Sequence, residues 1–314
     1  MSHQRPGGRV SEPRQAARAE VAMLAVVLIW GANFSFMKMA LAEMSGLSFA
    51  GLRFSLAAVI LLAVLRWREG SIALPREAWW TLVWMGLLSN TLYQVFFMYG
   101  LTHTSVANAS LIIATTPLIV ALLGAVTGIE ALRRPVVTGG LLGFAGVALI
   151  LAGKGVELGV GRLTGDLAIF GATLCWAFFT LGVRAMRLRI STLRLTAWTM
   201  ATGAPGLLLL GGPGLIDLDW RGLSLRAWTG VWYATLLAIV VAYLLWNNAV
   251  RVVGSGRTAI FNSMIPLIAM LVAWPLLGEH PRPIQIGGAA LIVSGVLLSR
   301  RASPVVRPAA LQPR

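Results

Sequence analysis

The sequence predicts an all-α membrane protein in which ten transmembrane helices form two inverted repeats of five helices around a central cavity. Three observations support this fold class. The composition is too apolar for a soluble protein, one apolar module occurs twice, and Lys and Arg are distributed unevenly among the expected loops. Together they indicate a chain that crosses a lipid bilayer many times as two similar halves.

The composition identifies the lipid bilayer as the environment of this chain. Of its 314 residues, 57% are hydrophobic and 12% are charged, whereas soluble domains carry about 25% charged residues. The net charge of +15 is therefore interpreted by the side of the membrane that the charges face, and no nucleic-acid partner is expected. The single cysteine, Cys175, lies in an apolar run, so neither a disulfide framework nor a thiolate metal site is expected, and no cofactor is predicted.

An internal duplication sets the architecture. The segment ANASLIIATTPLIVALLGAVTGIE at 107–130 is matched by GRTAIFNSMIPLIAMLVAWPLLGE at 256–279. The offset between the prolines is 266 − 117 = 149, and the offset between the closing glutamates is 279 − 130 = 149. The same offset aligns Leu87-Leu88 with Leu236-Leu237. A fixed offset without gaps is typical of repeated structural units.

Each span needs about 20 apolar residues, and clusters of Arg, Gly and Pro divide the chain into ten such segments. The expected spans are 20–41, 47–67, 78–100, 105–126, 135–153, 164–185, 193–212, 227–248, 255–277 and 284–299. The predicted organisation is an N-terminal tail at 1–19, a first repeat at 20–153, a connecting loop at 154–163, a second repeat at 164–300 and a C-terminal tail at 301–314.

Charge asymmetry between loops predicts the orientation. Nineteen Lys and Arg residues fall on the side shared by both termini, and five fall on the other side. Cytoplasmic loops are enriched in Lys and Arg, so both tails are expected in the cytoplasm. An odd number of spans in each half inverts the second copy. Inverted repeats hold a binding site near the midplane and alternate its access by rocking one half against the other.

Polar side chains inside the spans mark the predicted cavity, because they are costly against lipid. They favour a cavity lined by spans 20–41, 78–100, 105–126, 164–185, 227–248 and 255–277, with mid-span Trp residues as flat apolar walls. The candidate substrate-binding residues are Trp30, Asn33, Asn90, Tyr93, Gln94, Tyr99, Asn108, Trp176, Tyr243, Trp246 and Asn262. The alternative for each asparagine is a hydrogen bond between neighbouring helices, and for each tryptophan it is core packing.

Spans 135–153 and 284–299 have a different pattern, with glycines at one-turn spacing. Small residues at this spacing let helix backbones approach closely. We expect these two spans to form a packing scaffold without substrate contact.

A pair of matched prolines predicts hinges. Pro117 and Pro266 each remove one helical hydrogen bond and free the carbonyl four residues earlier, at Ile113 and Asn262. Inside a membrane, a freed carbonyl must be satisfied by protein, water or ligand. The two prolines are therefore candidate hinge or gate residues, with a kink that only shapes packing as the alternative.

Two glutamates at span ends are further gate candidates. Glu130 and Glu279 close the duplicated segments on opposite faces of the membrane. Each can pair with a nearby cation, Arg133 or Arg134 for the first and Arg282 for the second. A helix-end salt bridge without a gating role is the alternative.

Two basic residues inside the expected spans are predicted to reach the membrane surface. Lys38 and Arg53 lie near span ends, where a long side chain can extend to the membrane surface, with carboxylate binding as the alternative. No Asp or Glu falls at mid-span, which argues against proton coupling through a membrane-embedded carboxylate.

An enzyme is also disfavoured, because His3, His103 and His280 lie outside the spans and no catalytic pair is present. No catalytic residue is predicted.

The chain resembles the drug/metabolite transporter superfamily, in its ten-span EamA-type branch. The resemblance rests on WGANF at 30–34, GLRF at 51–54, the doubled Pro to Glu module, GDLAIFGATLCWAF from Gly165 and YLLWNNAVRVVG at 243–254. Within that branch it is most similar to amino-acid exporters of the YddG type. The resemblance implies a multi-pass carrier of the plasma membrane (the bacterial inner membrane) that exports amino acids or related metabolites.

The predicted function is thus a broad-specificity exporter of amino acids or related small metabolites, working by alternating access as a monomer. The alternative within the same fold is a carrier of nucleosides, sugars or toxic compounds, since neutral polar groups and aromatic rings suit all of these ligands.

Overall fold

The computed structural model describes residues 12–104, 106–153, 163–186, 190–268, 271 and 282–301, and every regular element in these ranges is a helix. The elements are α1 (Glu12–Leu41), α2 (Gly46–Glu69), α3 (Arg76–Gly86), η1 (Leu87–Leu92), α4 (Tyr93–His103), α5 (Val106–Ala114), α6 (Thr116–Val126), α7 (Arg134–Gly153), α8 (Leu163–Ala185), α9 (Thr192–Ile216), α10 (Leu225–Tyr233), η2 (Ala234–Val241), α11 (Ala242–Val253), α12 (Ser255–Ile260), η3 (Phe261–Ser263) and α14 (Pro283–Ser299). Residues 264–268 are also helical.

Serine caps explain where three of these helices begin. Ser45, Ser191 and Ser224 each have extended backbone and accept a hydrogen bond from the amide three residues later, at the starts of α2, α9 and α10. Such a cap satisfies one of the N–H groups that a first helical turn leaves unpaired. At the other end of α2, Gly70 adopts φ 71° and turns the chain away, a conformation that glycine tolerates best.

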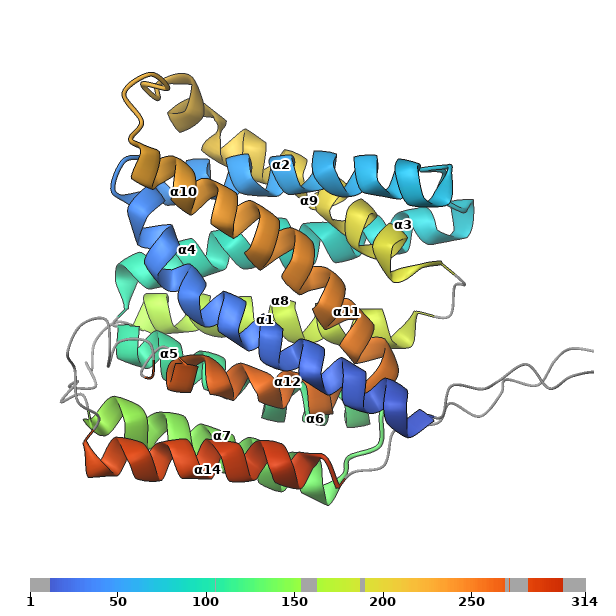
Figure 1. Cartoon of the computed structure of the whole chain (residues 1–314), viewed down its shortest axis with the longest axis vertical. Coiled ribbons are helices and arrows are strands. Elements are labelled where there is room, and N and C mark those ends of the chain that lie inside the picture. The colour runs from blue at the N-terminus through green and yellow to red at the C-terminus, as the bar shows by residue number, and fades with distance from the viewer. Residues whose placement is uncertain are drawn as a thin grey trace, which may run out of the picture.

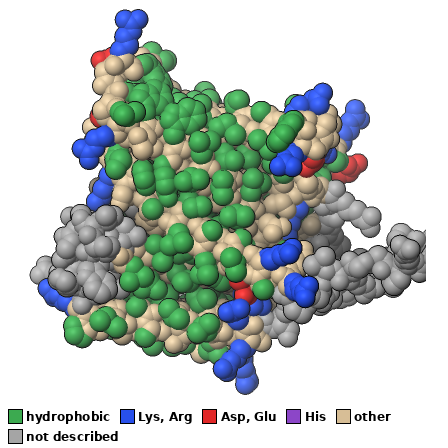
Figure 2. Space-filling view, viewed as in Figure 1, with side chains coloured by type: hydrophobic (Ala, Val, Ile, Leu, Met, Phe, Trp, Pro, Cys, Tyr) green, Lys and Arg blue, Asp and Glu red, His purple; other side chains and the backbone are tan. Residues whose placement is uncertain are grey.

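Many of the described helices are membrane-like. Six are long and apolar enough to cross a bilayer: Arg14–Leu41, Gly46–Glu69, Arg134–Ala152, Leu163–Ala185, Thr192–Ile216 and Leu225–Val253. Thr116–Val126 and Pro283–Ser299 are shorter apolar helices. Hydrophobic side chains cover the middle of the face in Figure 2, and Lys and Arg gather toward its two margins. Large apolar side chains at the surface include Leu209, which is 80% exposed. An apolar exterior of this kind is suited to lipid.

The bundle is built by pairing helices that are far apart in the sequence. The helices run side by side across Figure 1, with α7 and α14 at one edge. The main packing pairs are α7 with α14, α2 with α9, α4 with α8, α1 with α10 and α11, and α6 with α12. Each of these pairs joins the part of the chain before residue 154 to the part after it.

Glycines bring α7 and α14 into backbone contact, in the role that the sequence predicts for them. A Cβ added at Gly139 would lie 2.5 Å from the carbonyl oxygen of Gly295, and one at Gly146 would lie 2.5 Å from that of Gly288. Neither distance is compatible with a side chain. The close approach therefore requires glycine on both helices.

Two π-helical segments occupy matching positions. The segment η1 covers Leu87–Leu92, and adding the 149-residue offset gives 87 + 149 = 236 and 92 + 149 = 241, which falls within η2. A π segment widens the helical turn and is common next to functional sites. The duplication is thus visible in local backbone geometry as well as in the sequence.

Some boundaries differ from the sequence-based prediction. The first helix begins at Glu12, so residues 12–19, assigned to the N-terminal tail, are helical. The expected span 105–126 is divided at Thr115 into α5 and α6. Residues 154–162 and those after Arg301 lie outside the described residues.

Candidate functional site

A cavity of about 160 Å³ lies among the helices that carry most of the predicted site residues. Its aromatic lining consists of Trp30, Phe54, Tyr93, Phe97, Trp176 and Tyr243. Its polar lining consists of Asn33, Arg53, Gln94, Thr116, Thr173 and Asn262. These side chains come from α1, α2, α4, α6, α8, α11 and η3, so both parts of the duplicated chain contribute. An enclosed space of about 150 Å³ holds a molecule the size of benzene, which sets the scale of a ligand that fits here.

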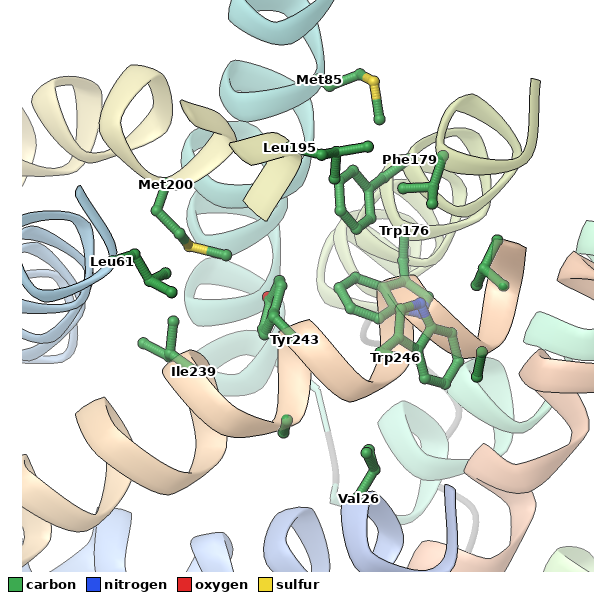
Figure 3. Close-up of a cluster of buried hydrophobic side chains, with 14 of the residues drawn as sticks. Val26, Leu61, Met85, Trp176, Phe179, Leu195, Met200, Ile239, Tyr243 and Trp246 are labelled. Atoms are coloured by element: carbon green, nitrogen blue, oxygen red, sulfur yellow. The ribbon is translucent and has the colours of Figure 1, made fainter. Parts of the chain in front are cut away.

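Aromatic rings form one wall of the cavity. The ring of Trp176 lies 5.7 Å from that of Trp30 and 5.5 Å from that of Tyr243, both edge-on. Behind this wall, Trp246 is fully buried, with its ring 5.3 Å from the rings of both Trp30 and Trp176. Figure 3 shows Trp176 beside Trp246, with Phe179 beyond and Tyr243 across from them. Offset and edge-on ring pairs of this kind hold one another rigidly.

One tryptophan of the wall is fixed by the π segment. Trp30 donates its Nε1–H to the carbonyl oxygen of Ala238 at 2.9 Å, and Ala238 belongs to η2. The neighbouring turn is also bonded to α1, because the Tyr233 hydroxyl donates to the Ile29 carbonyl at 3.2 Å. Local backbone geometry in the second half thus positions a cavity residue of the first half.

Three side-chain amides in the cavity wall have spare hydrogen-bonding capacity. The buried Oδ1 of Asn33, Oε1 of Gln94 and Oδ1 of Asn262 have no protein partner among the described residues. A buried acceptor without a partner costs about 1–3 kcal/mol. Three such acceptors in one small cavity indicate a site that supplies hydrogen bonds to something other than protein.

Arg53 lines the cavity, although it was not among the candidate binding residues. It was expected to extend to the membrane surface, and this expectation is wrong, because Arg53 is only 5% exposed and lines the cavity. Its Cζ atom lies 4.7 Å from the centre of the Phe49 ring and 5.2 Å from that of Phe54. Arg53 lies seven residues into α2, about 10 Å along the axis at 1.5 Å per residue. The position of Arg53 along α2 could be read from the sequence. The direction in which its side chain points from the helix could not.

Ion pairs close one end of the bundle. Glu130 accepts from Arg184 at 2.9 Å, and it also accepts from the backbone and hydroxyl of Ser255 at 2.9 and 2.8 Å and from the Gly256 amide at 3.3 Å. At the same end, Glu20 pairs with Arg257 and with Arg300. We call this the ion-pair end, defined by Glu20, Glu130, Arg184, Arg257 and Arg300.

Glu130 therefore joins the end of α6 to two other helices, α8 and α12. Its expected partners were the adjacent Arg133 and Arg134, whereas the structure bonds it to Arg184 of α8 and to the start of α12. The carboxylate also lies where the helix dipole and free N–H groups of α12 favour negative charge. The other gate candidate, Glu279, lies outside the described residues.

The chain matches a known family over most of its length. Residues 17–152 and again 163–301 match the EamA-like transporter family. The chain belongs to the EamA-like transporter family. It is a membrane transporter with a small-molecule substrate, and not an enzyme.

Curated relatives of this EamA-like transporter carry transporter names. An uncharacterised transporter of Bacillus subtilis is 27% identical over 91% of this chain and 94% of its own. A probable terminal-alkyne amino-acid exporter of Streptantibioticus cattleyicolor is 25% identical over 91% and 94% of the two chains. A probable amino-acid metabolite efflux pump of Salmonella typhimurium is 25% identical over 88% and 92%. One solved crystal structure shares the fold, with a TM-score of 0.75 at 18% identity, over 92% of this chain and 99% of its own.

The structure brings together seven of the residues that the sequence predicted for substrate binding in this EamA-like transporter. The cavity is lined by Trp30, Asn33, Tyr93, Gln94, Trp176, Tyr243 and Asn262. Trp246 lies behind the wall rather than in it. These positions support their assignment to one site, which stays a proposal.

Other predicted site residues lie elsewhere. Asn90 is fully buried in η1 and donates to the Thr199 carbonyl of α9 at 2.8 Å, so it bonds two helices, as the packing alternative anticipated. Tyr99 is 47% exposed and stacks on His103 with ring centres 4.0 Å apart. Asn108 belongs to α5, but its side chain lies outside the described residues.

The helix is interrupted beside Pro117, the first candidate hinge. Pro117 is at the start of α6, directly after the interruption at Thr115. The carbonyl of Ile113, which the proline leaves without its helical donor, accepts from the Thr116 hydroxyl instead. The freed acceptor is thus satisfied by the protein, although both Ile113 and Thr116 face the cavity. Near the second proline, Pro266, the helical turn tightens into η3.

Proposed function

We propose that this EamA-like transporter exports amino acids or closely related small metabolites across the bacterial plasma membrane by alternating access. The observation that carries the proposal is the cavity itself. Aromatic rings provide walls for an apolar side chain, and unpartnered amide groups provide acceptors for an amino group. Two curated relatives are named for amino-acid or amino-acid metabolite export, which supports this substrate class.

The proposed architecture is ten spans in two inverted repeats, at 20–153 and 164–300. It is supported by the double family match and by the pairing of helices across the two parts of the chain. Under a two-fold relation between five-helix halves, the pair α1 with α10 and α11 corresponds to the pair α8 with α4. The pairs α2 with α9 and α7 with α14 each correspond to themselves, and the pair α6 with α12 joins two matching expected spans, 105–126 and 255–277. These packing pairs support the proposed two-fold relation.

The proposed orientation places both termini, and with them the ion-pair end, in the cytoplasm. The support is the distribution of Lys and Arg, nineteen against five between the two sides. In this arrangement the ion pairs and the buried layer around Trp246 separate the cavity from the cytoplasm. The transporter is proposed to act as a monomer.

Roles follow for the predicted residues that line or close the cavity. Trp30, Asn33, Tyr93, Gln94, Trp176, Tyr243 and Asn262 are proposed to contact substrate. Pro117 and Pro266 are proposed as hinges, and Glu130 as part of the gate at the ion-pair end.

Counterflow into proteoliposomes tests the proposal. Vesicles containing the purified transporter and a mixture of unlabelled amino acids are diluted into labelled amino acids, and uptake is compared with vesicles that lack protein. Trp176→Ala should lose most of the uptake, since the ring is a main part of the cavity wall. Trp80→Ala is the matched control, because Trp80 is 71% exposed and does not line the cavity. Uptake of nucleosides or sugars without any uptake of amino acids would overturn the proposed substrate class.

A further inference from the structure

Within the described residues, the cavity wall contains a buried cation that has no carboxylate partner. Arg53 is 5% exposed, and its Nε has no hydrogen-bond partner among the described residues. The ion pairs of the described chain involve Arg184, Arg194, Arg257 and Arg300, and none includes Arg53. Burying a charge costs several kcal/mol unless a partner compensates it. A cation kept in this position without a partner in the described part of the chain indicates a partner that arrives with the substrate.

The surroundings of Arg53 hold its guanidinium without occupying its donors. The rings of Phe49 and Phe54 flank it at 4.7 and 5.2 Å. Aromatic rings stabilise the cation through their faces, but they accept no conventional hydrogen bond along its edge. A guanidinium edge presents parallel N–H donors whose spacing matches the two oxygens of a carboxylate.

The same cavity offers acceptors for the opposite charge. Asn33, Gln94 and Asn262 line it with buried amide oxygens that have no partner among the described residues. An ammonium group has three donors and no acceptor. One cation and three neutral acceptors around about 160 Å³ are therefore complementary to a small zwitterion.

We propose that Arg53 binds the carboxylate of the substrate while the amides of Asn33, Gln94 and Asn262 bind its amino group. This inference rests on the proposed transport function and narrows it to ligands with a free carboxylate. Neutral nucleosides and sugars leave the guanidinium uncompensated, and amines and amino-acid amides add a positive charge beside it. All of these ligands are disfavoured for the same electrostatic reason.

The experiment compares ligands that differ only in the carboxylate. Purified transporter in lipid nanodiscs is screened by thermal stability and calorimetry against the common amino acids, the amide of each, and a panel of uncharged nucleosides and sugars. We expect one or more amino acids to bind and their amides to bind about 10- to 100-fold more weakly, the range for one or two charge-assisted hydrogen bonds.

Three variants separate binding from folding. Arg53→Gln should weaken amino-acid binding to the level of the amide and remove the preference for the acid, and Arg53→Lys should restore part of the preference. Ligand-free Arg53→Met should melt no lower than wild type, because a buried cation without a partner is replaced by an apolar chain. A residue needed only for structure would give a lower melting temperature.

Arg194→Gln is the matched control, since Arg194 pairs with Glu69 away from the cavity. This variant should bind amino acids like wild type.

The outcomes are distinguishable. Equal binding of acids and amides, or unchanged acid preference in Arg53→Gln, would refute the role of Arg53 while leaving amino-acid transport intact. Binding of nucleosides or sugars only, with none of the amino acids, would refute the proposed function and this inference together.

Discussion

Neutralising Glu130 should open the ion-pair end of the transporter. The Glu130 side chain is 13% exposed and that of Arg184 is 7% exposed. Replacement by glutamine keeps the shape and some hydrogen bonds but removes the charge. The carboxylate accepts bonds from Arg184, from Ser255 and from the Gly256 amide. Charge-assisted bonds are about twice as strong as neutral ones, so the loss is roughly 0.7 kcal/mol for each of these four bonds.

These losses sum to about 3 kcal/mol, the lower end of the range for breaking a buried ion pair. Only the closed form loses this stabilisation, because it is the form in which Glu130 joins α6, α8 and α12. The population ratio of closed to open forms should therefore fall about 100-fold, because 1.4 kcal/mol corresponds to a factor of ten.

Cysteine labelling measures this change. Cys175 is the only cysteine of the chain, so Cys175→Ser gives a background in which Val183→Cys is the sole target. Val183 is 1% exposed and directly precedes Arg184. In nanodiscs, the maleimide reaction of this site should follow the open population and accelerate by up to about 100-fold in Glu130→Gln.

Two controls distinguish gating from general loosening. Glu69→Gln removes an ion pair with side chains 26% and 19% exposed, worth at most about 1 kcal/mol, and should leave labelling at 183 unchanged. Val147→Cys in the same background reports the fully buried core beside α14, and its labelling should not respond to Glu130→Gln. If Val183→Cys reacts at the same rate with and without Glu130→Gln, the ion pair only supports packing and the gating argument is wrong.

Four further predictions follow from local structure. Trp176→Phe should keep more transport and more stability than Trp176→Ala, whose loss of ring contacts should cost about 3–5 kcal/mol in a denaturation assay. Gly146→Ala should lower the melting temperature clearly, since its Cβ would meet the opposing helix at 2.5 Å, whereas Gly287→Ala has open space and should change little. Hydrogen bonds from Ser224 hold the pKa of Glu43 below its usual range, so the stabilisation by the ionised carboxylate is complete near neutral pH and is lost as pH falls through that lowered pKa. The melting-temperature difference between wild type and Glu43→Gln should therefore shrink as pH falls from neutral and vanish once it is below the lowered pKa. Because no carboxylate is expected at mid-span, amino-acid counterflow should persist after the pH gradient is collapsed with an ionophore, and complete loss would show proton coupling.

Helix positions could be predicted from the sequence because their signals are local. The apolar segment 135–153 corresponds to α7 at Arg134–Gly153, and 284–299 corresponds to α14 at Pro283–Ser299. Proline also predicted a kink within 105–126, since it removes a backbone donor wherever it occurs, and the structure interrupts the helix there. The offset of 149 residues indicated which elements would be alike, and the two π segments follow it.

The direction that each polar side chain faces could not be predicted in the same way. Asn90 and Gln94 are one turn apart and were both assigned to the cavity, but Asn90 bonds to α9 and only Gln94 lines the space. Arg53 lies on an almost uniformly apolar helix, which has no polar face to reveal its rotation. Glu130 meets Arg184, a residue 54 positions away in the sequence. Each of these results depends on packing between helices, which a single sequence does not specify.

The distribution of close packing explains how the bundle can tolerate an uncompensated site. At its edge, α7 and α14 meet backbone to backbone through reciprocal glycine contacts, and neither helix lines the cavity. Toward its centre, four side chains have polar atoms without a hydrogen-bond partner in the described protein: Arg53, Asn33, Gln94 and Asn262. Proteins keep destabilising groups of this kind at functional sites when the rest of the fold supplies the stability. If that reasoning holds, replacing Arg53 by methionine should keep the melting temperature of the empty transporter at or above that of wild type and weaken amino-acid binding about 10- to 100-fold. Gly146→Ala should lower the melting temperature and leave the affinity of the folded fraction unchanged. Opposite effects of two single substitutions on stability and affinity are the signature of a site that is completed by its ligand.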